Sequence, residues 1–392
     1  MDNKFNDVIS CRALYFNLSF YIGLWTIRIP TIKDQLETDY IGIGYILGTF
    51  AFGSILIMIF SNKFIKKFSS KKAIGISGIA QAMLWPIAPL IYDLNIFLFY
   101  AFIFGLCYGL FEVAINVQAS NIEKREKKSM MSGFHAFFSL GLLAGSFCTS
   151  LLLEINISFF LNVLIYIVVL LPMHILFVSY LHQDHSSIKK GKGNIFFLWP
   201  SLIFVLVFIT ISDSFTEGGI DSWGALYMRD AVNVEGFKIG IATISFNFFM
   251  VIGRLVGDRI RDKIGVYNFL ILLLTLSLIG LSIILNFNSL FSSIIGFSIV
   301  GFGISSIIPI AYSLASRIEG VDTAVGISII SISAYGVFMI APAFMGYIAK
   351  YLGINFVFSP MIILFSFCLI IVIFFKKKLS YNFQFGLMIY FR

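Results

Sequence analysis

The stretch Cys107–Gln118, CYGLFEVAINVQ, decides how this chain folds and where its chemistry lies. It belongs to an apolar run over 95–119 that is long enough, as a helix, to cross ~30 Å of hydrocarbon. The run nevertheless carries a carboxylate, Glu112, and places Asn116 one helical turn later. A charged side chain far from water is costly, and such residues usually face a cavity or a partner. The stretch therefore predicts a membrane-spanning helix with a working site on it.

Apolar runs of this kind recur from one end of the chain to the other. Of the 392 residues, 59% are hydrophobic and 12% are charged, and the mean hydropathy is +0.94; an ordinary soluble domain is about 45–50% apolar. Lipid offers the backbone no hydrogen-bond partners, and the runs lack the alternation of barrel strands, so we expect helices. The sequence predicts an all-α polytopic membrane protein with twelve transmembrane helices, at 10–30, 41–61, 73–91, 95–119, 130–152, 157–180, 195–217, 237–257, 266–287, 290–316, 323–348 and 354–375.

The positive charges indicate how the spans are oriented. The net charge is +8 and the isoelectric point is near 9.2. The basic residues occupy short loops, which indicates a lipid bilayer rather than a nucleic acid as the partner. With both termini in the cytoplasm, 23 of the 28 Lys and Arg residues lie on the cytoplasmic side, and the other five are Arg28, Lys33, Arg229, Lys238 and Lys350. We therefore expect a multi-pass protein of the plasma membrane, the inner membrane of a bacterium, with both termini cytoplasmic.

The chain also repeats itself at an offset of 196 residues. ASNIE at 119–123 returns as ASRIE at 315–319, and Gly105 corresponds to Gly301. Several matches at one offset indicate two pseudo-symmetric six-helix halves with the same topology. We expect a first half at 1–180, a cytoplasmic linker at 181–194, a second half at 195–378 and a cytoplasmic tail at 379–392.

Acids inside the spans are the strongest functional candidates. Seventeen of the twenty acidic residues fall in loops or at span ends, and the exceptions are Glu112, Asp213 and Glu217. Tyr108, Glu112 and Asn116 are spaced i, i+4, i+8 and so share one helix face. Burial favours the neutral form of a carboxyl group, so Glu112 can load and release a proton. The alternative is a structural, hydrogen-bonded acid.

His135 is the second candidate for proton coupling. It lies about as far into its span as Glu112 lies from the end of the preceding span, and a short loop joins the two. A pair between Glu112 and His135 is therefore possible. The alternative is a histidine satisfied by a backbone or a hydroxyl group, for which Ser139 at i+4 is one candidate.

Other polar residues in the spans are candidates for binding a small-molecule solute. They are Tyr108, Asn116, Gln118, Arg28, Asp213 and Glu217. Asp213, Glu217 and Asp221 share a face near the outer end of the seventh span, where Asp221 can also simply be solvated. Arg28 can pair with Glu217 or Asp221, hold an anionic solute, or extend to the interface. Trp25 and Trp223, near the same surface, can anchor the chain at the interface or line a cavity.

A charged segment after the eighth span, GRLVGDRIRDKIG at 253–265, is a candidate gate. Its acids and bases are expected at helix ends in the cytoplasm, and plain interfacial charge is the alternative reading. The corresponding segment in the first half is SNKFIKKFS at 61–69. The gating residues that this segment contributes are Gly253, Arg254, Asp258, Arg259, Asp262 and Lys263.

These features resemble the major facilitator superfamily, over essentially the whole chain. The loop motif of that family is G-x-x-x-D-[R/K]-x-G-[R/K]-[R/K], and 262–265 fits its centre, whereas Ser69 replaces the corresponding glycine in the first half. More narrowly, the chain resembles the fucose-permease-like branch and its MosC-like members. The stretches that carry this resemblance are LWTIRIPTIKDQL, GLFEVAINVQA, SGFHAFFSLGLLAGS, EGGIDSWGALYMRD and GRLVGDR.

The resemblance implies a secondary transporter that works by alternating access, with helices 1, 4, 7 and 10 around a central cavity. In sugar/proton symporters of that branch, a helix 4 E-x-A-x-N motif carries the proton-coupling glutamate, and Glu112, Ala114 and Asn116 match it. Those symporters also carry an aspartate within helix 1, whereas the nearest acid here is Asp34. We therefore expect a monomeric carrier of a sugar or sugar-like solute, coupled to protons, without a cofactor or a metal.

Three alternatives are weighed against this reading. An exporter of metabolites or drugs on the same fold is disfavoured because helix 5 has Gly141 and Gly145 without the glycine–proline pair typical of antiporters. A membrane enzyme needs a cluster of metal ligands or a nucleophile with its base, and the sequence offers neither. A sensor that no longer transports usually gains a sizeable cytoplasmic domain, for which the linker and tails are too short.

Overall fold

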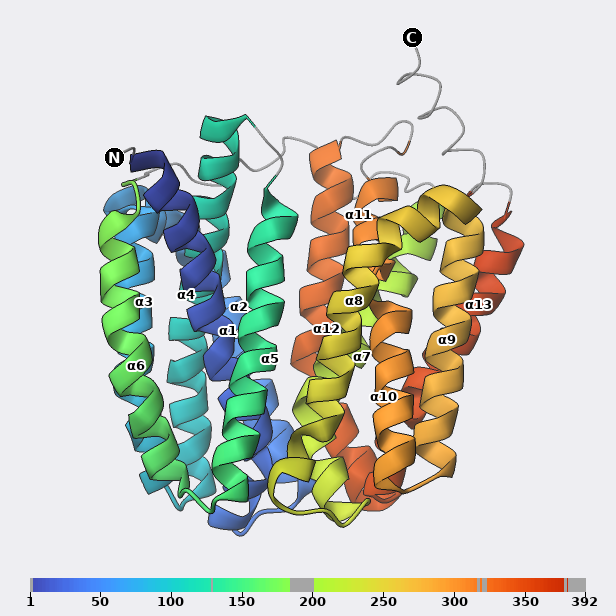
Figure 1. Cartoon of the computed structure of the whole chain (residues 1–392), viewed down its shortest axis with the longest axis horizontal. Helices are drawn as coiled ribbons and strands as arrows, with labels where there is room; N and C mark the ends of the chain where they lie inside the picture. The colour runs from blue at the N-terminus through green and yellow to red at the C-terminus, as the bar shows by residue number, and fades with distance from the viewer. Residues whose placement is uncertain are drawn as a thin grey trace. The chain divides into compact units, whose positions relative to one another are not determined.

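The computed structural model describes residues 3–127, 130–183, 201–315, 318, 323–376 and 379, with side chains placed except at 3–6, 62, 132, 258, 323–328, 335, 338 and 339. Their regular structure is helical (Figure 1). The elements in chain order are α1 (Asn3–Gln35), α2 (Tyr40–Phe68), α3 (Ser70–Leu84), η1 (Trp85–Leu90), α4 (Leu94–Glu126), α5 (Met131–Glu154), α6 (Phe159–Tyr180), α7 (Ser201–Asp230), η2 (Gly236–Gly240), α8 (Ile241–Ile264), α9 (Val266–Asn286), α10 (Leu290–Ile304), α11 (Ile307–Ala315), α12 (Thr323–Tyr351), η3 (Ile354–Phe356) and α13 (Ser359–Phe374).

These helices are long and apolar enough to span a bilayer. Among the described residues, ten segments meet this description by length and composition, and α10 and α11 together form one of them. The helices α1 and α12 contain 33 and 29 residues, which is also sufficient at 1.5 Å of rise per residue. The fold is therefore the all-α, twelve-span arrangement that the sequence predicts.

The chain forms two compact units. The first comprises residues 1–189 together with 233–240 and 342–350, and the second comprises 190–232, 241–341 and 351–392. Each unit thus contains most of one half of the sequence, and the first also includes η2 and the end of α12. Of the expected linker only 181–183 are described, and of the expected tail only residue 379.

Matching glycines place matching helices in contact within each unit. A Cβ atom added to Gly105 of α4 would overlap the carbonyl oxygen of Phe50 in α2, and one added to Gly301 of α10 would overlap that of Phe246 in α8. Both glycines and both phenylalanines are 196 residues apart. The sequence repeat is therefore a repeat of helix packing, because both crossings require a residue without a side chain.

Two turns with the same backbone geometry also occupy equivalent positions. Ser69 joins α2 to α3 with φ 79° and ψ 156°, and Gly265 joins α8 to α9 with φ 82° and ψ 157°. Only glycine adopts this region without strain. The backbone conformation of this turn is therefore repeated in both halves, although the residue type is not.

Two connections are shorter than the hydropathy pattern indicates. The expected loops at 31–40 and 218–236 are partly helical, because α1 continues to Gln35 and α7 continues to Asp230. In α7 the extension is held by tertiary contacts: Trp223 and Tyr227 are fully buried, and the Tyr227 hydroxyl donates to the carbonyl oxygen of Ile284 at 2.9 Å. The expectation that Trp223 lies at an interface or a cavity wall is therefore wrong, because its side chain is 0% exposed.

The tenth span is broken into α10 and α11 at Ser305 and Ser306. Pro309 lies one turn beyond the break and has no amide hydrogen to donate to the carbonyl group of Ser305. That carbonyl oxygen instead accepts a hydrogen bond from Arg254 Nε of α8, at 3.3 Å. Proline therefore creates an acceptor inside the span, and an arginine from another helix uses it.

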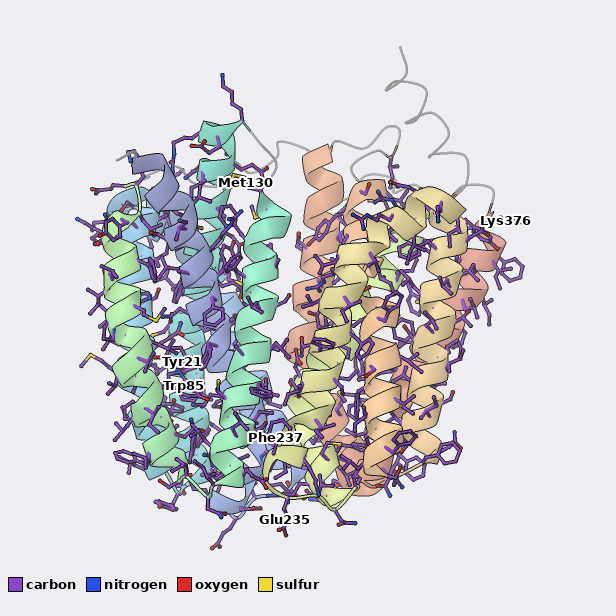
Figure 2. All side chains as sticks on the ribbon, in the orientation of Figure 1. Tyr21, Trp85, Met130, Glu235, Phe237 and Lys376 are labelled. Atoms are coloured by element: carbon purple, nitrogen blue, oxygen red, sulfur yellow. The ribbon has the colours of Figure 1, made fainter. Side chains whose placement is uncertain are left out.

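Figure 2 shows where the two ends of the first unit lie. Met130, beside the basic end of α4, lies at one end, and Phe237 of η2 lies at the opposite end. Tyr21 and Trp85, whose ring centroids are 5.8 Å apart in a stacked arrangement, lie between these ends.

Candidate functional site

Glu112 lies near the middle of α4 and is half-buried. Asn116, one turn further on, donates from Nδ2 to the main-chain oxygen of Glu112 at 2.8 Å. Its Oδ1 accepts a hydrogen bond from the hydroxyl group of Tyr15 in α1, at 2.7 Å. Tyr15 is buried, so this bond fixes the rotation of α1 against the helix face that carries Glu112.

The same tyrosine connects this face to α5. The ring centroids of Tyr15 and His135 are 5.4 Å apart, and the ring of Phe134 stacks on Tyr15 at 5.9 Å. The side chain of His135 is exposed. The hydroxyl group of Ser139 donates to the carbonyl oxygen of His135 at 3.3 Å, rather than to its ring. Glu112 and His135 thus lie on helices that meet at Tyr15, and their pairing stays a prediction.

Tyr108, one turn before Glu112, borders a group of aromatic rings. Its ring centroid is 5.3 Å from that of Phe50 in α2, which is 6.2 Å from that of Trp25 in α1. All three side chains are half-buried. The polar face of α4 therefore continues into aromatic surface, which suits the apolar faces of a sugar ring or a base.

Gln118 does not lie with this group. It is fully buried, accepts from the hydroxyl group of Ser70 at 2.6 Å and donates to the carbonyl oxygen of His182 at 3.0 Å. Nearby, Asp7 forms an ion pair with Arg125 at the end of α4. Gln118 thus joins the ends of α3, α4 and α6, and its expected role as a solute ligand has no support from these contacts.

Arg28 also makes contacts that hold the fold together. Only 2% of it is exposed; its Nε donates to Asn162 Oδ1 at 3.0 Å and its Nη2 to the carbonyl oxygen of Ile157 at 2.8 Å. Its guanidinium group also lies 5.8 Å from the ring centroid of Phe159. These bonds attach α1 to the turn between α5 and α6, whereas the sequence suggested an ion pair, a solute contact or an interfacial position.

The second unit holds the acids of α7 against α8. Arg254 Nη2 lies 3.6 Å from Glu217 Oε1, and Asn247 Nδ2 donates to Asp221 Oδ1 at 2.9 Å. Asn247 and Arg254 are seven residues apart, so they share a face of α8 and meet Asp221 and Glu217 in antiparallel order. Asp221 is therefore not simply solvated. Asp213, which lies one turn before Glu217 in α7, is 1% exposed.

The expected gate residues fall into two groups. Gly253 is buried where a Cβ would overlap the hydroxyl group of Ser305, and Arg254 reaches Glu217, so these two lie within the helix bundle rather than at the end of α8. Arg259 and Lys263 are exposed, and Arg261 pairs with Asp262 at 3.0 Å. The side chain of Asp258 lies outside the described part of the chain.

Three residues at these sites escaped the sequence reasoning: Tyr15, Asn247 and Ser305. Asn247 carried a usable signal, because an amide inside an apolar run shares a helix face with Arg254. Tyr15 and the main chain of Ser305 carried none, since a tyrosine or a serine in a membrane helix is common.

Comparison with known proteins agrees with this architecture. The family model described as Major Facilitator Superfamily matches residues 13–212 and again 203–381. The chain is 25% identical to an uncharacterized MFS-type transporter of Yersinia pestis over 87% of this chain and 88% of that protein. It is also 25% identical to the membrane protein MosC of Rhizobium meliloti, over 87% of this chain and 83% of that protein.

Solved structures show the same fold at low sequence identity. A mutant of the nucleoside transporter NupG superposes with a TM-score of 0.74 at 11% identity, covering 95% of this chain and 99% of that one. A bacterial homolog of the human lysosomal transporter Spinster, crystallised in an inward-facing, unoccupied conformation, gives 0.67 at 12% identity and covers 98% of each chain. The fold and the relatives are those of transporters and not of enzymes. Because the family model accounts for both halves of the sequence, this chain belongs to the major facilitator superfamily.

Proposed function

We propose that this chain is a secondary active transporter that moves a small hydrophilic solute, a sugar or sugar-like metabolite, by alternating access and with coupling to protons. The observation that carries the proposal is Glu112, a half-buried carboxylate in the middle of a 33-residue membrane helix. Such a carboxylate is costly unless it works. Its proton is the coupling ion in this proposal, with His135 as the second titratable group beside Tyr15.

The solute is bound by the groups around this carboxylate. Asn116 and Tyr108 share the helix face of Glu112, and Trp25 and Phe50 add aromatic surface. Polar groups select the hydroxyl pattern of a solute, and aromatic rings cover its apolar faces. In the second unit, taken by itself, Glu217 has 27% of its side chain exposed and pairs with Arg254. Because NupG is a nucleoside transporter, nucleosides belong among the solutes to test.

Coupling requires that the proton change the balance between two conformations. A proton or a solute shifts that balance only by its differential affinity for the two states. In this proposal Glu112 is neutral in the state that carries the solute and releases its proton on the other side. The distribution of Lys and Arg further supports a location in the bacterial plasma membrane, with both termini in the cytoplasm.

The experiment begins with the solute, because coupling is measured with it. Purified protein is screened for an increase in thermal stability with sugars, polyols, nucleosides and carboxylates at two pH values. The stabilising solute is then used for uptake into proteoliposomes under an imposed proton gradient. Glu112→Gln is expected to abolish accumulation driven by the gradient while leaving exchange of internal for external solute.

Glu126→Gln is the matched control, because it makes the same change at the end of the same helix. It is expected to accumulate solute as the wild type does. Full gradient-driven uptake by Glu112→Gln would refute proton coupling at this residue. If solute accumulates inside the vesicles only when the proton gradient is directed out of the lumen, the result would instead favour the exporter alternative.

A further inference from the structure

The acids of α7 are not equally neutralised in the structure. Three carboxyl groups, those of Asp213, Glu217 and Asp221, face one arginine, Arg254. Arg254 lies beside Glu217, and the amide of Asn247 donates to Asp221. If all three acids were ionised, Arg254 would offset one of the three negative charges, as far as the described side chains show. Asp213 takes part in neither of these two contacts.

Asp213 lies in a fully covered position. It is 1% exposed, and its Oδ1 is buried without a hydrogen-bond partner among the described atoms. Among the described side chains, the titratable and charged groups that act on it are Glu217 from its own helix, Arg254 from α8 and Cys368 from α13. The Cys368 thiol already donates to the hydroxyl group of Ser212, at 3.2 Å. A carboxylate in such a place is unfavourable, whereas a carboxylic acid is not, because the acid carries no charge to desolvate.

A metal ion fits the group less well than a proton. Among the described residues, no set of three or more His, Cys, Asp and Glu side chains is arranged to hold a metal. Asp221 and Glu217 are also directed to an amide and an arginine on α8 rather than to a shared point. The ligand that satisfies a single buried, unpartnered carboxylate oxygen is one proton.

We propose that Asp213 is a second proton-binding site, distinct from Glu112 and contained within the second unit. The step transfers one proton from a hydronium ion of the bulk solvent: an O–H bond of the hydronium breaks, one O–H bond forms on the Asp213 carboxylate, and a water molecule is left. Glu217 and Arg254 set the charge beside the site: while they are paired, Asp213 is a neutral acid. Arg254 is also bound to the carbonyl group that Pro309 leaves free, so movement at the α10–α11 break changes the charge that Asp213 meets.

Infrared spectroscopy of the purified protein tests this proposal without a solute, so it stands or fails apart from the transport proposal. The carbonyl stretch of a protonated carboxylic acid is separate from the amide bands, and aspartate labelled with heavy carbon in its carboxyl group shifts it selectively. At neutral pH the wild-type protein is expected to show a protonated aspartic acid. Its absence from folded wild-type protein would overturn the proposal, whether or not any variant folds.

Three variants assign the signal. It is expected to disappear in Asp213→Asn, to remain in Asp213→Glu as an unlabelled acid band of equal area, and to remain present in Asp221→Asn. Glu112→Gln, which tests the transport proposal, is expected to leave the labelled band in place. Loss of the band in Asp221→Asn, or its persistence in Asp213→Asn, would assign the proton elsewhere and contradict the proposal.

Discussion

At the scale of single residues, Tyr15 shows how a site can depend on a residue with no signal of its own. Its hydroxyl group bonds Asn116, and its ring contacts both His135 and Phe134. The sequence placed Glu112, Asn116 and His135 on two helices and left open how these meet. A buried tyrosine from a third helix provides that connection.

Tyr15→Phe is expected to lower the affinity for the solute about 2- to 10-fold, because it removes one neutral hydrogen bond worth about 0.5–1.5 kcal/mol and keeps the ring. The measurement is the concentration dependence of the initial uptake rate in proteoliposomes. Tyr227→Phe is the control, since that hydroxyl also bonds a buried carbonyl group, in the second unit. It is expected to lower the melting temperature without changing the affinity. Equal affinities for Tyr15→Phe and wild type would remove Asn116 from the binding site.

At the scale of helices and turns, the two repeated turns differ in a testable way. Ser69 and Gly265 share one backbone conformation, in a region where a residue with a Cβ is strained by about 1–3 kcal/mol. The Ser69 hydroxyl accepts weakly from the amide of Lys72, at 3.3 Å, and its loss to glycine costs only a few tenths of a kcal/mol. Relief of strain therefore exceeds the lost cap.

Ser69→Gly is accordingly expected to stabilise the protein by about 1 kcal/mol. Gly265→Ala is expected to destabilise it by a similar amount, through the backbone alone, because no atom lies within 4 Å of the added Cβ. Both are measured as midpoints of thermal unfolding in detergent. A lower midpoint for Ser69→Gly would mean that the serine cap matters more than the strain.

The division of the tenth span is also decided at this scale. Hydropathy treats 290–316 as one run, and it is one membrane span by composition. Pro309 and the two serines before it break the helix within that run, and Arg254 of α8 occupies the carbonyl group that results. The proline can be read from the sequence, whereas the arginine that compensates for it cannot.

At the scale of the whole molecule, contacts between distant parts of the sequence hold the first unit together. Lys350, at the end of α12, lies 2.6 Å from Asp39, which also caps α2 through the amide of Gly42. The hydroxyl groups of Tyr45 and Tyr347 are 3.0 Å apart. These pairs are 311 and 302 residues apart in sequence, so the first unit includes residues from both halves of the chain.

The ion pair with Lys350 gives a pH dependence whose sign is fixed. The pKa of Asp39 is lowered, chiefly by the hydrogen bond from Lys350. The hydrogen bond from the Gly42 amide acts in the same direction. A lowered folded-state pKa stabilises the protein above the ordinary pKa of aspartate, about 3.9, and this contribution is lost as the pH falls through the folded value.

Asp39→Asn is expected to destabilise the protein by about 0.2–1 kcal/mol at pH 7, as for an exposed ion pair, because asparagine keeps the cap. The difference from wild type, measured by thermal unfolding, is expected to be the same at pH 5 and to shrink as the pH falls below the ordinary pKa of aspartate. Lys350→Gln is the matched variant and should show the same profile. A difference that grows on acidification would contradict this assignment.

The polar sites do not follow the repeat. The residues at the offset of 196 from Asp213, Glu217 and Asp221 are Asn17, Tyr21 and Trp25, and the residue that corresponds to Glu112 is Ile308. The repeat therefore preserves packing glycines and turns, which any helix crossing of this kind needs, and not the acids inside the spans. The two proposed proton sites differ in their partners for the same reason.

The sequence by itself determined the membrane fold, the twelve spans, the two halves and the acids that stand out within the spans. These follow from hydropathy and charge, which are local properties that the bilayer acts on directly. The tertiary structure alone decided that Gln118 and Arg28 hold helix ends together, that Trp223 is buried, and that Arg254 reaches Glu217. Each of these depends on the rotation and depth of one helix against another. Successive residues differ by about a quarter of a turn, so a small change in packing, which no local pattern records, sends the same side chain to lipid, to a neighbouring helix or to a site.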